Sequence, residues 1–331
     1  MEKKYDVYGI GNALVDLELK VEEQFLNENE VKKGLMTLVD EETQFKLIGA
    51  IEGQEYDRKS GGSAANSIIA ISQFGGKSYY ACKVANDEFG DYYLKDMNEA
   101  GVDTNLDGKE RGDGITGKCL VMVTPDADRT MNTFLGATSD ISIDEVDEEA
   151  IKASKYVYLE GYLTASPTGF EAMKHAKKVA ERNGVKTSLT LSDPSIVQAF
   201  KDKFVEVIGA SVDLLFCNEE EAKALTGTTD ILEAREALKS EAKQFVITLG
   251  SNGAMIYDGD TFIDIEPYQV RAVDTNGAGD MFAGAFLYGI TNGHSMAGSG
   301  KLASLAGSKV VSQFGPRLPL AEAQKVLKEI V

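Results

Sequence analysis

The chain of 331 residues has few of the side chains that build metal sites, disulfides or linkers. Its two histidines, His175 and His294, exclude a histidine-rich metal site. Its three cysteines, Cys82, Cys119 and Cys217, lie far apart and match no metal-binding spacing, so we expect buried thiols in a reducing, cytoplasmic compartment. Only six prolines are present, without a proline-rich tract, which favours one compact unit.

Basic residues and long apolar runs are also scarce. The 34 lysines and arginines face 53 acidic residues, so the formal net charge is -19. Nucleic acids and anionic membranes bind basic faces, and this composition argues against both as partners. No signal-like apolar stretch opens the chain, and no run approaches the roughly 18 apolar residues that span a bilayer. An anionic substrate such as a nucleotide would need local help from arginine, a metal ion or helix ends.

Short apolar strands alternate with helices from residue 156 onward. We expect strands at 5–10, 156–159, 186–191, 212–216 and 245–249, and helices at 167–182, 195–208, 218–239, 277–292 and 294–312. Such alternation predicts an α/β fold with a parallel sheet covered by helices on both faces. Strands expected at 16–22, 118–124 and 130–135 are not each followed by a helix, so they predict a small separate β-layer.

The most informative segment, residues 274–280, reads Asp-Thr-Asn-Gly-Ala-Gly-Asp and opens an apolar helix. The first N–H groups of a helix lack internal partners and lie at the positive end of its dipole. Gly277, Ala278 and Gly279 leave these groups accessible, so an anion can be held there. Asp280 would stand beside a bound phosphate as the acceptor of a hydroxyl proton, which indicates phosphoryl transfer. The alternative is an acid that only complements the dipole.

Three other segments are candidates for binding. Gly61-Gly62-Ser63-Ala64-Ala65-Asn66 opens a second helix and offers the Asn66 amide to substrate hydroxyls, or else forms only a tight turn. Asn218 and Glu221 form a capping box, or hold hydrated Mg²⁺. Residues 248–253, Thr-Leu-Gly-Ser-Asn-Gly, form either a hairpin turn or a loop facing a nucleotide.

Polar residues follow several of the expected strands: Asn12, Asp193, Asn218 and Thr248. Ligands of parallel sheets bind beyond the carboxyl ends of the strands, so these residues predict one crevice. Gly9-Ile10-Gly11 resembles the start of a dinucleotide fingerprint, but position 14 is leucine where the third glycine belongs. A nicotinamide dehydrogenase is therefore disfavoured.

Together and in this order, these motifs resemble the ribokinase-like (PfkB) carbohydrate kinase family, from Asn12 to about Phe314. Residues 274–285 are similar to its second signature, residues 61–66 to its first, and Asn218 with Glu221 to its Asn-x-x-Glu motif. The resemblance implies a single three-layer α/β/α domain over 1–331 with a small β-sheet lid. The lid strands are expected within 14–22, 35–39, 115–124 and 129–136.

The resemblance also implies ATP and Mg²⁺ as cofactors, with a monovalent cation as a further possibility. Asp280 would be the base, the N–H groups of Gly277, Ala278 and Gly279 would hold the γ-phosphate, and Arg129 would assist. The resemblance implies that the acceptor is bound by Asn12, Asp16, Gly62, Ser63 and Asn66. It implies that ATP is bound by Asn218, Thr248, Gly250 and Gly253. Glu221 with Asn218 would bind Mg²⁺ through water.

The acceptor is expected to be a purine nucleoside, with adenosine first. Residues 12–16, 61–66 and 129–137 resemble the adenosine kinase branch, and Leu38, Phe134, Leu135 and Tyr162 are candidate walls for the base. The alternatives are a free-sugar kinase, for ribose, fructose or a keto-deoxy sugar acid, and a non-catalytic nucleotide-binding regulator. The chain is expected to be a monomer or a homodimer joined through its lid.

Overall fold

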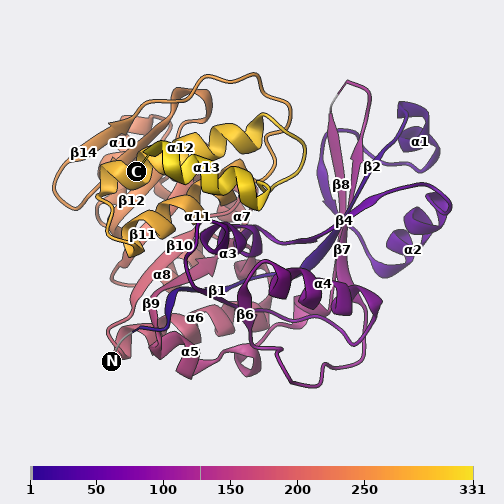
Figure 1. Ribbon diagram of the computed structural model, residues 1–331, viewed down its shortest axis with the longest axis horizontal. Coiled ribbons are helices and arrows are strands. Elements are labelled where there is room, and N and C mark those ends of the chain that lie inside the picture. The colour runs from indigo at the N-terminus through magenta and orange to yellow at the C-terminus, as the bar shows by residue number, and fades with distance from the viewer. Residues whose placement is uncertain (1–2, 127, 331) are drawn as a thin grey trace.

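The computed structural model describes residues 3–126 and 128–330, and its strands form two sheets (Figure 1). The larger sheet has nine strands in the order β14-β13-β12-β11-β10-β9-β1-β5-β6. Their bounds are β1 (Tyr5–Ile10), β5 (Ser78–Ala81), β6 (Val102–Thr104), β9 (Ser154–Glu160), β10 (Lys186–Thr190), β11 (Val212–Asn218), β12 (Ala242–Thr248), β13 (Ala254–Tyr257) and β14 (Phe262–Ile265). Neighbours pair in parallel except β12 with β13 and β13 with β14. The prediction of a mainly parallel sheet is therefore confirmed.

Helices cover both faces of this sheet, because strands such as β1 are buried along their whole length and expose no polar face. One face carries α3 (Ser63–Gln73), α11 (Ala278–Thr291), α12 (Met296–Val311) and α13 (Leu320–Ile330). The other carries α5 (Glu148–Lys152), α6 (Pro167–Arg182), α7 (Pro194–Ala199), α8 (Lys201–Ile208), α9 (Glu219–Thr226) and α10 (Ile231–Leu238). Each face has its own apolar cluster, so the domain has the three expected layers. Among the described residues, no helix has the length and apolarity to cross a membrane.

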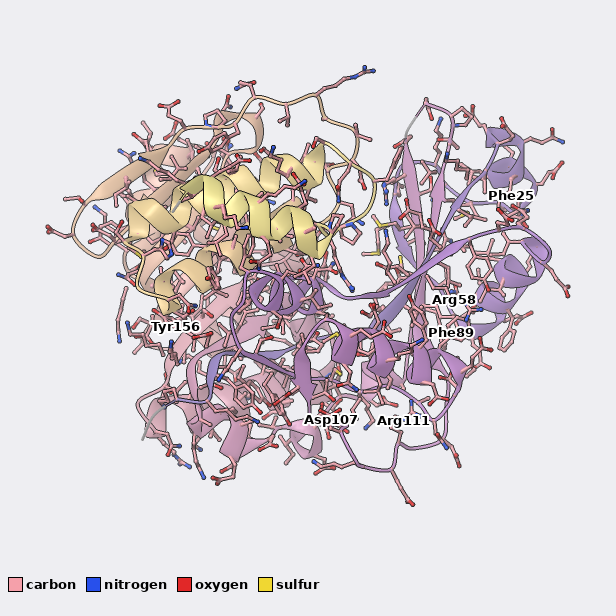
Figure 2. The ribbon with its side chains drawn as sticks, viewed as in Figure 1. Phe25, Arg58, Phe89, Asp107, Arg111 and Tyr156 are labelled. Atoms are coloured by element: carbon pink, nitrogen blue, oxygen red, sulfur yellow. The ribbon has the colours of Figure 1, made fainter. Side chains whose placement is uncertain are left out.

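The second sheet has five strands in the order β3-β8-β7-β2-β4. They are β2 (Leu14–Lys20), β3 (Met36–Leu38), β4 (Asp57–Gly61), β7 (Thr116–Val123) and β8 (Arg129–Gly136), with α1 (Glu23–Glu28) and α2 (Glu41–Ala50) beside them. Arg58 of β4 lies over the ring of Phe89 in α4 (Glu88–Glu99), with 5.0 Å between guanidinium carbon and ring centroid (Figure 2). This contact ties the edge of the second sheet to the main domain.

The two faces of the second sheet differ in character. Registers pair Asp16 with Cys119 and Cys119 with Thr133, so these three side chains share one face, here called the inner face. Val15 and Leu17 lie on the opposite, outer face and join the apolar cluster of Leu26 in α1 and Leu47 in α2. Helices α1 and α2 therefore cover the outer face, as Figure 1 also shows.

Several predicted boundaries were wrong. The helix expected at 195–208 is broken at Phe200 into α7 and α8, and the one at 218–239 ends at Gly227, which adopts φ +74 and terminates α9. The strand expected to reach residue 22 ends at Lys20. The sequence prediction also missed β4 and helix α13, so three helices rather than two close the chain.

The three cysteines are buried and free, as expected.

Candidate active site

Polar residues meet at the carboxyl ends of the central strands. Asn12 follows β1, Glu160 ends β9, and Asn218 and Thr248 are register partners at the ends of β11 and β12. Asp193 follows β10 and caps α7 through its side chain. The expected single row of polar groups is therefore present along this edge of the sheet.

Helix α11 begins at this edge, and Gly277 is its N-cap with φ +74. An added Cβ at Gly277 would lie 2.4 Å from Pro316, so both the backbone conformation and the packing require glycine. The space around Gly279 is open. The N–H of Ala278 donates to the carbonyl of Thr275 at 3.3 Å, so it is less available than expected.

Asp280 lies in the first turn of α11 and is held by helix α3. Its Oδ1 accepts a hydrogen bond from Ser63 Oγ at 2.6 Å, and its Oδ2 accepts one from Asn66 Nδ2 at 3.0 Å. The two helices approach closely because Gly284 of α11 leaves room for the backbone of Ser67. Burial raises the pKa of Asp280 to about 6, and the bonds from Ser63 and Asn66 oppose that rise. The carboxyl is thus mainly ionised at neutral pH.

The paired glycines and Asn66 are in close contact with neighbouring protein groups. An added Cβ would lie 2.4 Å from Asp16 Oδ1 at Gly61 and 2.2 Å from the carbonyl oxygen of Asn12 at Gly62, so these glycines admit neighbouring protein groups. The Asn66 amide donates to Asp280, and its Oδ1 accepts from Arg317 Nε at 2.9 Å. Both ends of the amide therefore have protein partners, and its Nδ2 end holds Asp280 Oδ2.

Asn12 is held by Glu160, which the sequence prediction missed. Glu160 Oε1 accepts from the backbone N–H and Nδ2 of Asn12, and Oε2 accepts from the N–H of Ala64. The side chain is fully buried, and burial raises the pKa of Glu160 to about 7. An acid ending an apolar strand in this row of polar residues was a signal available in the sequence.

Asn218 and Glu221 form the capping box at the start of α9. Asn218 Oδ1 accepts from the N–H of Glu221 at 2.8 Å, and the Glu221 carboxyl accepts from the N–H and Nδ2 of Asn218. Burial raises the pKa of Glu221 to about 7. Burial also raises the pKa of Tyr162, and it is raised further by four acids around it: Asp193, Asp280, Glu160 and Glu221. Among the described residues, no three His, Cys, Asp or Glu side chains come close enough to ligate a metal together, so Glu221 and Asn218 fit Mg²⁺ only as partners of its bound water.

The segment 248–253 joins β12 to the antiparallel β13, so it is a hairpin connection. Gly253 has φ +89, and an added Cβ would lie 2.0 Å from the carbonyl oxygen of Ile265. Packing therefore already explains glycine at this position. Gly250 has φ +57 and open space around it, which leaves it accessible to a ligand next to Thr248.

Arg129 lies on the inner face of the second sheet and is already paired. Its Nη2 contacts Asp274 Oδ2 at 2.6 Å and Glu18 Oε1 at 2.9 Å. Asp274 also accepts from the N–H groups of Asn276 and Gly315. The arginine expected on a transferring phosphate thus ties the second sheet to the loop that precedes α11.

Phe134, which we expect to border the acceptor, is placed in the second sheet by the register of β8. It pairs with Lys118 and therefore lies on the outer face, opposite to Asp16. It lines a cavity of about 640 Å³ together with Leu38, Thr133 and Leu135. The inner face instead presents four residues beside Asp16: Cys119, Met131, Thr133 and Leu135. Leu38 pairs with Thr133 in parallel and shares that face.

Helix α11 thus combines a glycine-rich N-terminus with an ionised acid, and polar groups surround it at the edge of a parallel sheet. This arrangement is that of a phosphotransferase with an alcohol acceptor. The chain belongs to the pfkB family of carbohydrate kinases, whose family model matches residues 31–323. The resemblance found in the sequence is confirmed.

Three relatives illustrate the range of acceptors. The crystal structure of adenosine kinase from Sinorhizobium meliloti is 34% identical, covers 99% of this chain and 100% of its own, and superposes with a TM-score of 0.89. A probable sugar kinase from Rhizobium etli CFN 42 is 35% identical with the same coverage and TM-score. A 5-dehydro-2-deoxygluconokinase of Clostridium perfringens is 24% identical over 98% of this chain and 93% of its own length. These similarities support the adenosine kinase-like branch and leave the acceptor open between nucleoside and sugar.

Proposed function

We propose that this protein transfers the γ-phosphate of ATP to a primary hydroxyl, with adenosine as the leading acceptor. The observation that carries the proposal is the placement of Asp280 beside the N-terminus of α11, with both carboxylate oxygens held by Ser63 and Asn66. A fixed carboxylate next to an anion site is what an in-line transfer to a hydroxyl requires.

Asp280 acts as the base in this proposal. A sugar hydroxyl does not ionise at neutral pH, so the carboxylate accepts its proton as the bond to phosphorus forms. With a pKa of about 6, Asp280 is mostly ionised at pH 7 yet remains a usable proton acceptor. The open backbone at Gly279 receives the phosphoryl oxygens, and the positive end of α11 stabilises their charge.

Mg²⁺ would be held through water by Glu221 with Asn218, and when bound it would neutralise charge on the phosphates. Burial is the main cause of the raised pKa of Glu221, and a nearby cation would favour its ionised form. Thr248 and Gly250 would border the nucleotide at the neighbouring strand end.

The inner face of the second sheet provides the acceptor side, and we infer that this sheet serves as a lid. Asp16 offers a carboxylate to the hydroxyls of a ribose, and Met131 and Leu135 offer apolar surface to a base. Arg129 is already paired with two acids, whereas Lys59 is the register partner of Asp16 and brings a positive charge to the same face. The charges on this face therefore do not choose between a neutral acceptor and a sugar acid.

A free-sugar kinase is the second candidate, supported by the similarity to a 5-dehydro-2-deoxygluconokinase. A pair of variants separates the two. Leu135→Ala should raise the KM for adenosine about 10- to 100-fold, the usual effect of lost apolar contact, and leave a ribose KM unchanged. Val205→Ala, an exposed apolar residue of α8 on the other side of the main sheet, is the control and should change neither KM. Equal effects of both variants would remove the support for a nucleoside base on the inner face.

The test of the chemistry is ADP release with ATP and Mg²⁺, measured with adenosine, ribose, fructose and 5-dehydro-2-deoxygluconate in turn. Asp280→Asn should lower turnover about 10²- to 10⁴-fold, the range for general-base catalysis, while calorimetry still detects ATP binding. Asp260→Asn, an exposed acid in the turn before β14, is the control and should behave as wild type. Undiminished turnover in Asp280→Asn would refute the base, and ATP binding without turnover of any acceptor would favour a regulator.

A further inference from the structure

Arg317, in the segment between α12 and α13, uses each nitrogen of its guanidinium group. Nε donates to Asn66 Oδ1, Nη1 to Asp96 Oδ2 and Nη2 to Ser60 Oγ, each at 2.9 Å. Its side chain is only 11% exposed. A planar guanidinium that engages three partners in a fixed geometry is held much more firmly than a surface arginine.

The bond to Asn66 bears directly on Asp280. An asparagine amide has one acceptor end and one donor end, and the two can exchange by rotation. Because Arg317 is a donor and takes Oδ1, the Nδ2 end must face Asp280 Oδ2, where it donates at 3.0 Å. We propose that Arg317 is a positioning residue for phosphoryl transfer, which fixes the Asn66 amide and through it the carboxylate of Asp280.

Arg317 is itself anchored on both sides. Asp96 of α4 accepts from Arg317 and from the N–H and hydroxyl of Ser60, the last but one residue of β4. Burial alone would raise the pKa of Asp96, but Arg317 and Ser60 outweigh it, so that pKa is lowered and the pair stays charged. Strand β4 leads straight into Gly61 and Gly62, so the arginine also braces the turn that opens α3.

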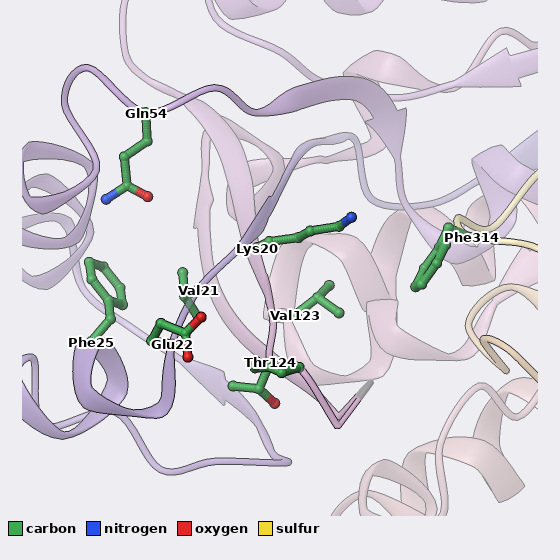
Figure 3. Close-up of a pocket in the computed structure, with 9 residues that line it drawn as sticks. Lys20, Val21, Glu22, Phe25, Gln54, Val123, Thr124 and Phe314 are labelled. Carbon is green, nitrogen blue, oxygen red and sulfur yellow. The ribbon is translucent and has the colours of Figure 1, made fainter.

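The segment that carries Arg317 touches the phosphate side and the second sheet as well. The N–H of Gly315 donates to Asp274 at 2.8 Å, and Pro316 packs against Gly277 at the start of α11. Phe314 lines a cavity of about 580 Å³ with Lys20 and Val123 at the ends of β2 and β7 (Figure 3). Residues 314–317 therefore connect the anion site, the base and the second sheet.

Arg317 also opposes the excess of acids around the base. The charge of Asp280 raises the pKa of five other titratable groups on β2, β9, η3 (Gly161–Ala165) and α9. They are Asp16, Tyr158, Glu160, Tyr162 and Glu221. Arg317 lowers the pKa of both Asp280 and Asp16, against the effect of burial. Loss of its charge should therefore raise the pKa of the base.

This inference rests on the proposed function, and its test measures kcat, the KM for ATP and the pH profile of Arg317→Met. We expect kcat to fall about 10- to 100-fold at pH 7, as misplacement of a reacting group does. The KM for ATP should stay within about threefold, because no bond from Arg317 reaches the anion site. The acid limb of the kcat profile should move to higher pH, because the charge of Arg317 lowers the pKa of Asp280.

Two further variants separate positioning from general stability. Arg111→Met is the matched control, because the Arg111 side chain is 10% exposed and pairs with Asp91 away from Asp280. It should leave kcat and the acid limb unchanged. Arg317→Lys keeps the charge but not the three-way geometry, so its acid limb should stay in place while kcat still falls. If Arg317→Met does not fold, the kcat and the acid limb of Arg317→Lys decide whether Arg317 positions Asp280.

An Arg317→Met protein that folds and keeps both kcat and the acid limb would overturn the inference, as would equal losses in Arg111→Met. The proposed function fails separately. If Asp280→Asn retains turnover, the base assignment is lost, whereas an inactive Asp280→Asn with a normal Arg317→Met refutes only the role of Arg317.

Discussion

Asp274 should be one of the most costly acids to remove from this protein. Its side chain is 1% exposed, forms an ion pair with Arg129 at 2.6 Å, and accepts hydrogen bonds from the N–H of Gly315 at 2.8 Å and from the N–H of Asn276 at 3.0 Å. It therefore joins the second sheet, the segment before α13 and the loop before α11 at one point.

The loss of stability in Asp274→Ala can be estimated from the groups that lose their partner. Two backbone N–H groups lose their acceptor, at about 1 to 3 kcal/mol each for a buried donor. Arg129, 12% exposed, keeps only Glu18 at 2.9 Å as a partner. Because Glu18 remains, the arginine is not left without a partner, and the two unsatisfied N–H groups dominate. We therefore expect the free energy of unfolding to fall by about 2 to 6 kcal/mol.

The assay is urea unfolding followed by far-ultraviolet circular dichroism, since the chain has no tryptophan for fluorescence. Asp264→Ala, an exposed acid on β14, is the control and should change stability by less than about 0.5 kcal/mol. A double-mutant cycle with Arg129→Met should give a coupling of about 1 to 3 kcal/mol. A loss below about 1 kcal/mol in Asp274→Ala would refute the reasoning, because the three contacts would then be replaced without cost.

Three other expectations follow from the site. The pKa values of Glu160 and Glu221 are raised to about 7, so at these two carboxyls the folded chain binds more protons than the unfolded chain above pH 5. The free energy of unfolding should therefore fall by roughly 1 kcal/mol per carboxyl as pH rises from 6 to 8. Chemical denaturation at several pH values measures this change, and a stability that does not vary with pH would contradict it. Glu221→Gln should raise the Mg²⁺ concentration for half-maximal turnover about tenfold, measured by titration of the ion. Gly277→Ala should lower stability by about 2 kcal/mol because of its positive φ and the contact with Pro316, whereas Gly279→Ala should keep the melting temperature and lose turnover.

Much of the fold could be predicted from local patterns. The period of apolar residues located β1 and α6 with their observed bounds, and the change of rhythm after residue 156 separated the main domain from the second sheet. Strand β4 could not be found this way, because Asp-Arg-Lys-Ser-Gly has no apolar alternation and becomes a strand by pairing with β2. The break at Gly227 was readable, since glycine followed by the capping Asp230 marks the end of one helix and the start of another.

One part of the candidate site could likewise be predicted from local sequence, and another part could not. The segment 274–280 is local, and its glycines and acid indicated an anion site with a base. The partners of Asp280 and Asn66 are not local, because Arg317 lies 251 positions from Asn66 and no spacing rule joins them. The segment 129–136 was correctly predicted as a strand, but the face on which Phe134 lies could not be predicted, because neighbouring side chains point to opposite faces and the register that selects the face comes from pairing with β7.

Alternate residues of strand β8 lie on opposite faces of the second sheet. This alternation bears on how the acceptor of such a kinase can change during evolution. Met131, Thr133 and Leu135 border the inner face, while Thr130, Asn132 and Phe134 belong to the outer face that α1 and α2 cover. Under the proposed function, substitutions at the first set would alter what the site accepts without opening a gap beneath the helices. Descendants of one ancestor can thus acquire new acceptors by changing alternate residues of a single strand, with the fold kept intact by the residues between them.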